Sequence, residues 1–236
     1  KMAKTRHTFD MQKRFLPAVL LLSVLLAMFV ACGLQLERTR AFSFAAEASA
    51  RRVYLTFDDG PSTVVTGRVL DILKEENIKA TFFIVSDMAK TRQETLLRIA
   101  EEGHSLGVHS ASHDYQRIYS SDEALLADID ECAAYIFQVT GVTPRLYRFP
   151  GGGHERQREL IRERGYEIVG WNAVCGDEEI PHASAERLVK EALRTGKGKD
   201  PVILLLHDSA RHKETAEALP SIIARFREEG CVFCAF

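Results

Sequence analysis

The chain has 236 residues, of which 46% are hydrophobic and 27% charged, and its formal net charge is -2. This composition is that of a globular protein, and its charge balance excludes a generally basic nucleic-acid binder. Five cysteines are too few for a disulfide-stabilised scaffold, and fifteen glycines with seven prolines are too few for a fibrous or low-complexity chain.

The first predicted element is a long apolar segment near the N-terminus. Phe15–Leu36 contains no charged side chain, and a helix of this length matches a hydrocarbon core about 30 Å thick. Five basic residues precede the segment, opposed only by Asp10. This basic flank favours an N-terminus inside the cell and the rest of the chain outside.

Three interpretations of this segment remain open: an uncleaved signal-anchor, a signal peptide cleaved near residues 45–50, and a lipoprotein leader with Cys32 as its modified residue. We expect the anchor. Residues 1–36 are then a cytoplasmic tail plus a single membrane span, and residues 37–51 are a short linker. The remaining chain is expected outside the cytoplasm, held at the membrane or secreted if the leader is cleaved.

From residue 52 onward, β-rich runs alternate with amphipathic helical patterns. Strands are predicted at 52–58, 80–86, 105–109, 145–150, 166–171, 202–207 and 231–236, and helices at 63–76, 91–102, 120–140, 154–164, 184–195 and 213–229. This alternation predicts a parallel sheet with helical crossovers. We therefore expect an α/β fold, a distorted (β/α) barrel with about seven parallel strands, as a single domain over residues 52–236.

Polar side chains gather at the ends of the predicted strands. They are Asp58 and Asp59 after the first strand, His109 and His113 at the third, Arg148 in the fourth, Asp177 after the fifth and His207 at the sixth. Active sites of α/β folds lie at the carboxyl ends of parallel strands. One such residue would be weak evidence, but several polar residues at the same end of the sheet predict an active site there.

The two histidines suggest a metal centre. His109 and His113 share one face of an extended or helical backbone, so both imidazoles can converge on one ion. With a carboxylate from another strand end, this ligand set suits catalytic zinc and also non-haem iron. Of the adjacent acids Asp58 and Asp59, one can bind the metal while the other accepts a proton. Taken alone, two surface histidines and an ordinary turn would be the commoner explanations of these residues.

Four motifs together resemble those of polysaccharide deacetylases of the NodB-homology type, which are metal-dependent carbohydrate esterases. They are Thr-Phe-Asp-Asp-Gly at 56–60, His-Ser-Ala-Ser-His at 109–113, Arg-Phe-Pro-Gly-Gly at 148–152 and Leu-Leu-His at 205–207. The family's remaining motif, Asp-x-x-Asp-Trp, is altered, because only its second Asp has a counterpart, Asp177. The resemblance extends from Val53 to Phe236.

The resemblance implies a role for each matching residue at the reacting centre. Asp59, His109 and His113 would hold a divalent metal, with zinc expected and cobalt or manganese as alternatives. Asp58 would act as the general base on the attacking water. His207 would act as the general acid toward the departing amine.

The resemblance also implies supporting residues. Arg148 would position the general base, and Asp177 would support either Arg148 or the general acid. The backbone N–H of Gly151 is the candidate oxyanion donor, since the preceding proline has none. Leu205 would line the pocket for the acetyl methyl group, and Trp171 is a further substrate-binding candidate.

The expected activity is hydrolysis of N-acetyl groups on an extracellular amino-sugar polymer, with peptidoglycan first and chitin-type oligomers still open. An O-acetyl esterase acting on xylan, or another small amide or ester hydrolase of the same fold, is one alternative. A non-catalytic glycan-binding protein is another. The expected partners are an acetylated glycan and, through residues 15–36, the membrane; no basic patch indicates nucleic acid.

Overall fold

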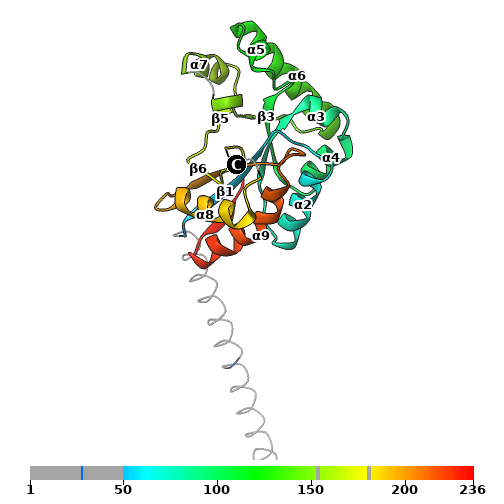
Figure 1. Cartoon of the computed structure of the whole chain (residues 1–236). Helices are drawn as coiled ribbons and strands as arrows, with labels where there is room; N and C mark the ends of the chain where they lie inside the picture. Colours follow the sequence, from blue (N-terminus) through cyan, green and yellow to red (C-terminus); the bar gives the residue numbers. More distant parts are fainter. Residues whose placement is uncertain (1–27, 29–49, 153–154, 180–181) are drawn as a thin grey trace, which may run out of the picture. The chain divides into compact units, whose positions relative to one another are not determined.

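The computed structural model describes residue 28 and residues 50–152, 155–179 and 182–236 (Figure 1). Residues 51–236 form one folded unit. The predicted anchor and linker lie outside the described residues, apart from Met28 and residues 50–51. In the part of the chain that is described, no helix is both long enough and apolar enough to cross a bilayer.

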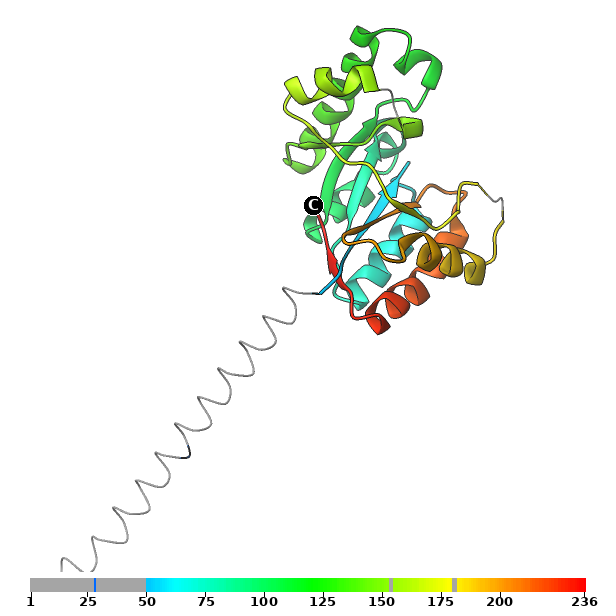
Figure 2. The ribbon, with the colours of Figure 1, turned by 90° about the vertical axis from the view of Figure 1, so that its left-hand side faces the viewer.

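Short parallel strands form the centre of this unit (Figure 2). They are β1 (Arg52–Asp58), β2 (Thr81–Val85), β3 (Ser105–Ser110), β4 (Leu146–Tyr147), β5 (Glu167–Ile168), β6 (Ala173–Val174), β7 (Val202–His207) and β8 (Val232–Cys234). Seven follow the order β5-β4-β3-β2-β1-β7-β6, and β8 pairs with the start of β1. The prediction of a parallel sheet of about seven strands is confirmed.

The two edge strands of the sheet are neighbours in sequence. Only Val169–Asn172 separate β5 from β6, a connection that spans at most about 18 Å. In a flat sheet, seven strands would hold these edges about 29 Å apart, at roughly 4.8 Å per strand. The sheet must therefore curl until its edges approach each other, which gives a curled half-barrel in agreement with the predicted distorted (β/α) barrel.

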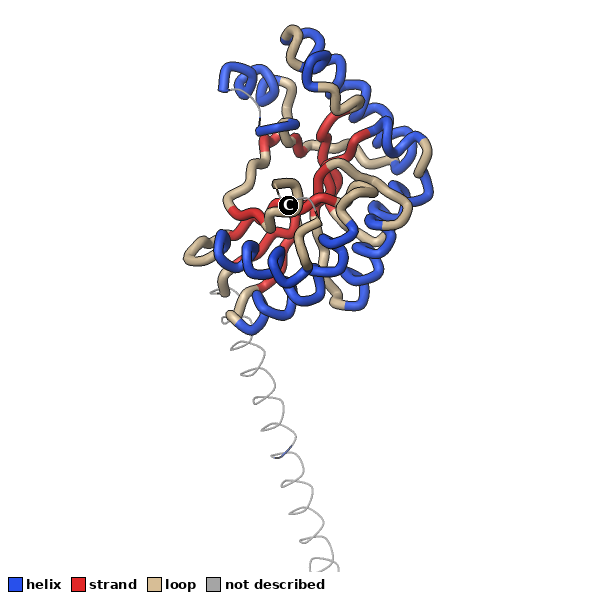
Figure 3. The backbone as a smooth tube through the Cα atoms, in the orientation of Figure 1, coloured by secondary structure: helices blue, strands red, loops and turns tan. Residues whose placement is uncertain are grey.

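Helices cover the outside of the curled sheet (Figure 3). They are α2 (Val65–Glu75), α3 (Ser86–Lys90), α4 (Gln93–Glu101), α5 (Tyr115–Ile118), α6 (Asp122–Thr140), α7 (Glu155–Glu163), α8 (Ala185–Gly196) and α9 (Lys213–Glu228), with a 3-10 turn, η1, at Pro150–Gly152. The six longer helices match the predicted ones. The short elements α3, α5 and β6 were not predicted, because they are too short to show a periodic pattern.

Helix α6 illustrates how the sequence sets these elements. The Ser121 hydroxyl accepts a hydrogen bond from the N–H of Ala124 at the start, and Gly141 ends the helix in the left-handed conformation, with φ 72°. The buried stripe that faces the sheet consists of Leu125, Asp128, Ile129, Cys132 and Ile136. A carboxylate within an apolar stripe needs polar partners, and Asp128 finds them in the loop at the end of β3.

His104 is a buried histidine that the fold holds in its neutral form. It is 7% exposed, and its Nδ1 accepts a hydrogen bond of 3.1 Å from the N–H of Ala80. Burial lowers the pKa of His104 to about 4, with a further lowering from Lys79 that outweighs Glu102. Protonation of Nδ1 would also remove the acceptor for the Ala80 N–H.

Acidification should therefore destabilise the fold through His104. Because the folded pKa lies below the unfolded value near 6.5, the unfolded chain takes up the proton first as pH falls. The stabilisation is complete above about pH 6.5, and about 2 kcal/mol of it is lost at pH 5. The free energy of unfolding, measured in urea, should fall between pH 7.5 and pH 5. This fall should be smaller in His104→Asn than in the wild type by about 2 kcal/mol. His182→Asn, at a side chain that is 90% exposed, should behave as the wild type does. Equal pH dependence in all three proteins would contradict the prediction.

Candidate active site

The carboxyl ends of the central strands open into one cavity of about 680 Å³. Asp58, at the end of β1, lies in register with Phe83 on β2 and with His207 on β7. Residues in register on parallel strands point to the same face of the sheet. The aspartate and the histidine therefore face the same space, although 149 positions separate them in the sequence.

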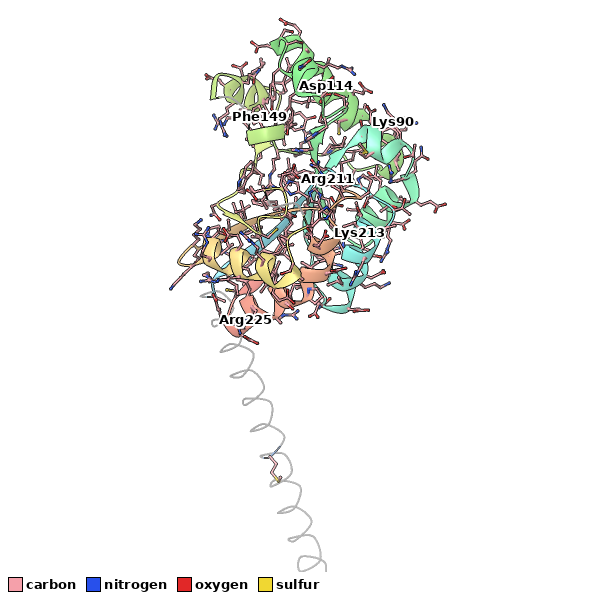
Figure 4. The ribbon with its side chains drawn as sticks, in the orientation of Figure 1. Lys90, Asp114, Phe149, Arg211, Lys213 and Arg225 are labelled. Atoms are coloured by element: carbon pink, nitrogen blue, oxygen red, sulfur yellow. The ribbon has the colours of Figure 1, made fainter. Side chains whose placement is uncertain are left out.

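Most of the predicted site residues line this cavity: Asp58, Asp59, His109, His113, Gly151, Trp171, Leu205 and His207. The remaining two do not line the cavity but contact residues that do: Arg148 binds Asp58, and Asp177 binds His207. Asp114, Phe149 and Arg211 also line the cavity and come from three separate loops (Figure 4). The structure thus brings together every predicted site residue.

Asp59, His109 and His113 form a group suited to a metal ion. The Nε2 atoms of His113 and His109 lie 3.1 Å and 3.4 Å from Oδ1 of Asp59, and one ligand atom from each residue lies within 4.8 Å of the others. Nδ1 of His109 donates a hydrogen bond of 2.9 Å to the carbonyl of Arg148, which leaves the Nε2 lone pair free. Two imidazoles and one carboxylate, open toward a cavity, fit a divalent ion with positions left for other ligands.

The electrostatics of this group follow from its partners. Burial by itself raises the pKa of the Asp59 carboxyl, but hydrogen bonds and charge from His109 and His113 lower it below its ordinary value. The backbone is also unusual here, because Asp59 and His113 are non-glycine residues with φ of 74° and 57°. Such conformations are rare outside glycine and cluster at functional sites.

The loop that carries Asp59 rests on a second carboxyl group, that of Asp208. A side chain on Gly60 would collide with this carboxylate, so glycine is required there. Asp208 is 1% exposed and accepts a hydrogen bond of 2.6 Å from the hydroxyl of Thr66. Burial raises the pKa of Asp208 to about 7. Sequence analysis missed this role, because nothing in the sequence separates Asp208 from an exposed turn residue.

Asp128 on α6 holds the loop between the two histidines. Its Oδ2 accepts hydrogen bonds from the Ser110 hydroxyl at 2.7 Å and the Ala111 N–H at 2.9 Å. Its Oδ1 accepts from the N–H and hydroxyl of Ser112 at 3.2 Å and 3.1 Å. The Ser110 hydroxyl in turn accepts from the N–H of His113 at 2.8 Å. Sequence analysis missed Asp128, although an aspartate within the apolar stripe of α6 was a detectable signal.

Replacing Asp128 with asparagine should weaken metal binding without removing a ligand. The amide nitrogen of asparagine cannot accept the hydrogen bonds that one carboxylate oxygen accepts, so the histidine loop loses part of its support. We expect metal affinity to fall by about 10- to 100-fold, as measured by metal titration. Asp130→Asn is the matched control, because Asp130 is an exposed carboxylate on the same helix. Wild-type affinity in Asp128→Asn would contradict this role.

Arg148 is a fully buried cation that connects four parts of the site. It is 1% exposed, and its Nη1 donates to Oδ1 of Asp58 at 2.9 Å and to the Thr56 hydroxyl at 2.8 Å. Its Nε and Nη2 donate to the carbonyls of Val169 and Gly170 at 3.1 Å and 2.9 Å. A buried charge is tolerated only when its donors are satisfied in this way. Arg148 therefore fixes the orientation of the Asp58 carboxylate.

A flat aromatic support lies beneath the guanidinium group. The ring of Phe83 is 4.2 Å from Cζ of Arg148, a distance suited to a cation–π contact. Phe83 lies in register with Gly107 on β3. Any side chain at Gly107 would collide with the Phe83 ring, so this glycine makes room for the aromatic support.

His207 and Asp177 form a second hydrogen-bonded pair at the cavity. Nδ1 of His207 lies 2.9 Å from Oδ1 of Asp177, and the backbone N–H of His207 donates to Oδ2 at 2.8 Å. Burial lowers the pKa of His207, but the hydrogen bond and charge of Asp177 outweigh it and raise the pKa to about 9. The raised pKa favours the protonated imidazole, which is the form that can donate a proton. Of the two partners that the sequence left open for Asp177, the structure pairs it with His207.

Comparisons with known proteins agree with this geometry. The family model described as polysaccharide deacetylase matches residues 45–169, just over half of the chain. A peptidoglycan-N-acetylglucosamine deacetylase of Bacillus cereus is 30% identical over 190 residues, covering 78% of this chain and 68% of that protein. The enzyme PgdA of Listeria monocytogenes, of the same name, is 34% identical over 183 residues, but the chain spans only 37% of its length.

Solved structures show the same fold. The catalytic domain of a peptidoglycan N-acetylglucosamine deacetylase from Eubacterium rectale superposes with a TM-score of 0.71 at 29% identity, covering 80% of this chain and 89% of that one. The polysaccharide deacetylase Bc1974 from Bacillus cereus superposes with a TM-score of 0.73 at 28% identity, covering 79% and 92%. The likeness extends over nearly the whole of the folded unit and agrees with the predicted distorted barrel.

Proposed function

Because this chain belongs to the polysaccharide deacetylase family, it is a hydrolase, and we propose that it removes N-acetyl groups from an amino-sugar polymer in a metal-dependent reaction. Peptidoglycan N-acetylglucosamine is the first candidate substrate, since similar proteins carry that name. Zinc is the expected metal, because two imidazoles and one carboxylate with open positions are typical of catalytic zinc.

One observation carries this proposal. A carboxylate held by a buried arginine and an imidazolium held by a buried carboxylate face the same cavity, beside the Asp59, His109 and His113 group. Amide hydrolysis needs a proton acceptor for the attacking water and a proton donor for the leaving nitrogen. The site offers one of each, and a divalent ion when bound would act as a Lewis acid toward the carbonyl and the water.

Asp58 is the proposed general base. Nη1 of Arg148 donates to Oδ1 of Asp58 and is itself held by the Thr56 hydroxyl, so the carboxylate keeps one orientation toward the cavity. A fixed carboxylate is ready to accept the proton of an attacking water without reorganising first. Arg148 then acts as a positioning residue, because it touches the base rather than the substrate.

His207 is the proposed general acid. Its Nδ1 is engaged by Asp177, so the proton on Nε2 is the one available to a leaving amine. Gly151 remains the proposed oxyanion donor: it lines the cavity, and its φ of 66° is a conformation that glycine adopts freely. Leu205 would contact the acetyl methyl group.

The cavity wall supports a sugar substrate. Trp171, Tyr115 and Phe149 line it, and flat aromatic faces bind the apolar faces of sugar rings. Trp171 is 38% exposed, so part of its surface is free for such a contact.

We also propose that residues 15–36 anchor the protein with residues 52–236 outside the cytoplasm, where a cell-wall polymer is accessible.

Acetate release tests the proposed function. The full chain would be supplied with zinc, cobalt or manganese and given N-acetylglucosamine oligomers, peptidoglycan or acetylxylan. Metal-dependent release from the first two, well above release from acetylxylan, is the expected result. Faster release from acetylxylan would favour the O-acetyl esterase, and bound metal without release from any glycan would favour a binding protein.

A further inference from the structure

A second set of metal-ligating side chains lies beside His207. Glu178, His207 and His212 each offer one ligand atom, and these atoms lie within 4.8 Å of one another. None of the three belongs to the Asp59 group. We propose that they form a second site for a divalent transition metal such as zinc, and that an ion bound there inhibits the enzyme.

His212 is already arranged as a metal ligand. It is 4% exposed, and its Nε2 lies 2.9 Å from Oε2 of Glu178. Its Nδ1 lies 2.9 Å from the hydroxyl of Ser209. A hydroxyl accepts as well as donates hydrogen bonds, so His212 can carry its proton on Nδ1 and present the Nε2 lone pair to an ion. An oxygen partner on the far ring nitrogen is usual for metal-binding histidines.

His207 has the same arrangement. Asp177 engages its Nδ1, and in the part of the chain that is described no hydrogen-bond partner occupies Nε2. A carboxylate behind a histidine orients the ring and strengthens it as a ligand. The rings of His207 and His212 lie side by side, with centroids 4.9 Å apart and planes at 29°. The two rings are thus neighbours, and their ligand atoms lie within 4.8 Å of each other and of a Glu178 oxygen.

Glu178 completes the site from the solvent side. Its side chain is 47% exposed and lines both the large cavity and a neighbouring cavity of about 230 Å³. Asp177 and Glu214 also line the smaller cavity, and their negative charge favours a cation. Nη2 of Arg211 donates to both carboxylate oxygens of Glu178, at 2.7 Å and 2.9 Å, but the Arg211 side chain is 65% exposed, so an ion would displace a solvent-exposed ion pair.

Occupation of this site would stop the reaction for a specific reason, which rests on the proposed function. The proposed general acid must hold a proton on Nε2, and an ion at the second site would displace that proton to solvent and bind the same nitrogen. Metal would thus activate the enzyme through the Asp59 group and inhibit it at higher concentration through Glu178, His207 and His212.

Metal counting tests the site independently of activity. Metal-free full chain would be titrated with zinc by calorimetry. His212→Gln and Glu178→Gln should each bind one ion fewer than the wild type, or bind the weaker ion at least about tenfold less tightly. Glu178 is exposed, so its variant should fold even if the other does not. His182→Gln is the control, because it replaces an exposed histidine that lines the same small cavity. Wild-type binding in both test variants would overturn the proposal.

Acetate release then tests inhibition. Wild-type activity should rise as the first ion binds and fall in excess zinc, whereas Glu178→Gln should need at least about tenfold more zinc for the same fractional loss. Equal inhibition of wild type and Glu178→Gln would overturn the inhibitory role. If no glycan releases acetate at any zinc concentration, the proposed function fails, while the ion count still decides whether the site exists.

Discussion

Replacing Asp58 with asparagine is expected to lower acetate release by about 10²- to 10⁴-fold while the protein keeps its metal. Asparagine has nearly the same shape and still offers an oxygen to Arg148, but it cannot accept a proton at neutral pH. Turnover per folded molecule and metal content, measured on the same preparation, would separate loss of the base from loss of the ion.

The same substitution should also destabilise the fold. Arg148 is buried and Asp58 is its carboxylate partner, so the neutral amide leaves the guanidinium charge uncompensated, at a cost of up to about 3–5 kcal/mol. Denaturant unfolding would measure this loss, with Asp71→Asn as the control at an exposed, paired carboxylate. If Asp58→Asn kept wild-type turnover, the assignment of the base would be wrong.

Replacing His109 with alanine is expected to abolish metal binding at the Asp59 group and, with it, acetate release. His109 is 3% exposed, and its Nε2 is directed toward Asp59 by the hydrogen bond from Nδ1 to Arg148. Removing this ligand leaves one imidazole and one carboxylate, which is too few for a tight site. Metal analysis after dialysis would measure the loss.

The control for this variant is His182→Ala, which removes an exposed imidazole elsewhere. It should keep metal and activity at wild-type levels. Excess zinc should restore little activity to His109→Ala, since a ligand is missing rather than weakened. A His109→Ala protein with full metal content at the Asp59 group would overturn the assignment of that group as the metal site.

The sequence predicts those parts of the structure that local patterns specify. Strand β1 is an apolar run ended by Asp58-Asp59-Gly60, so both its extent and the position of its acids were predictable. The same holds for His109 and His113, whose spacing is local. The structure brings these side chains together because parallel strands end at one rim, and their roles stay predictions until tested.

Contacts between distant parts of the chain could not be predicted from the sequence. The support of the histidine loop by Asp128 depends on how α6 packs on β3, and the partner of Asp177 depends on which strand lies beside it. Strand β6 has two residues and no pattern of its own, since pairing with β7 defines it. Patterns within a segment carry no information about such pairings.

The buried guanidinium of Arg148 ties the connection between the two edge strands, β5 and β6, to strand β1 inside the sheet. Its Nε and Nη2 hold the Val169–Gly170 carbonyls of the short connection between β5 and β6, while its Nη1 holds Thr56 and Asp58 on the central strand. One side chain thus fixes the β5–β6 connection in place and orients the proposed base. Laboratory evolution of this enzyme for new substrates must therefore leave position 148 unchanged, because a substitution there would release the β5–β6 connection from β1 as well as alter the proposed base.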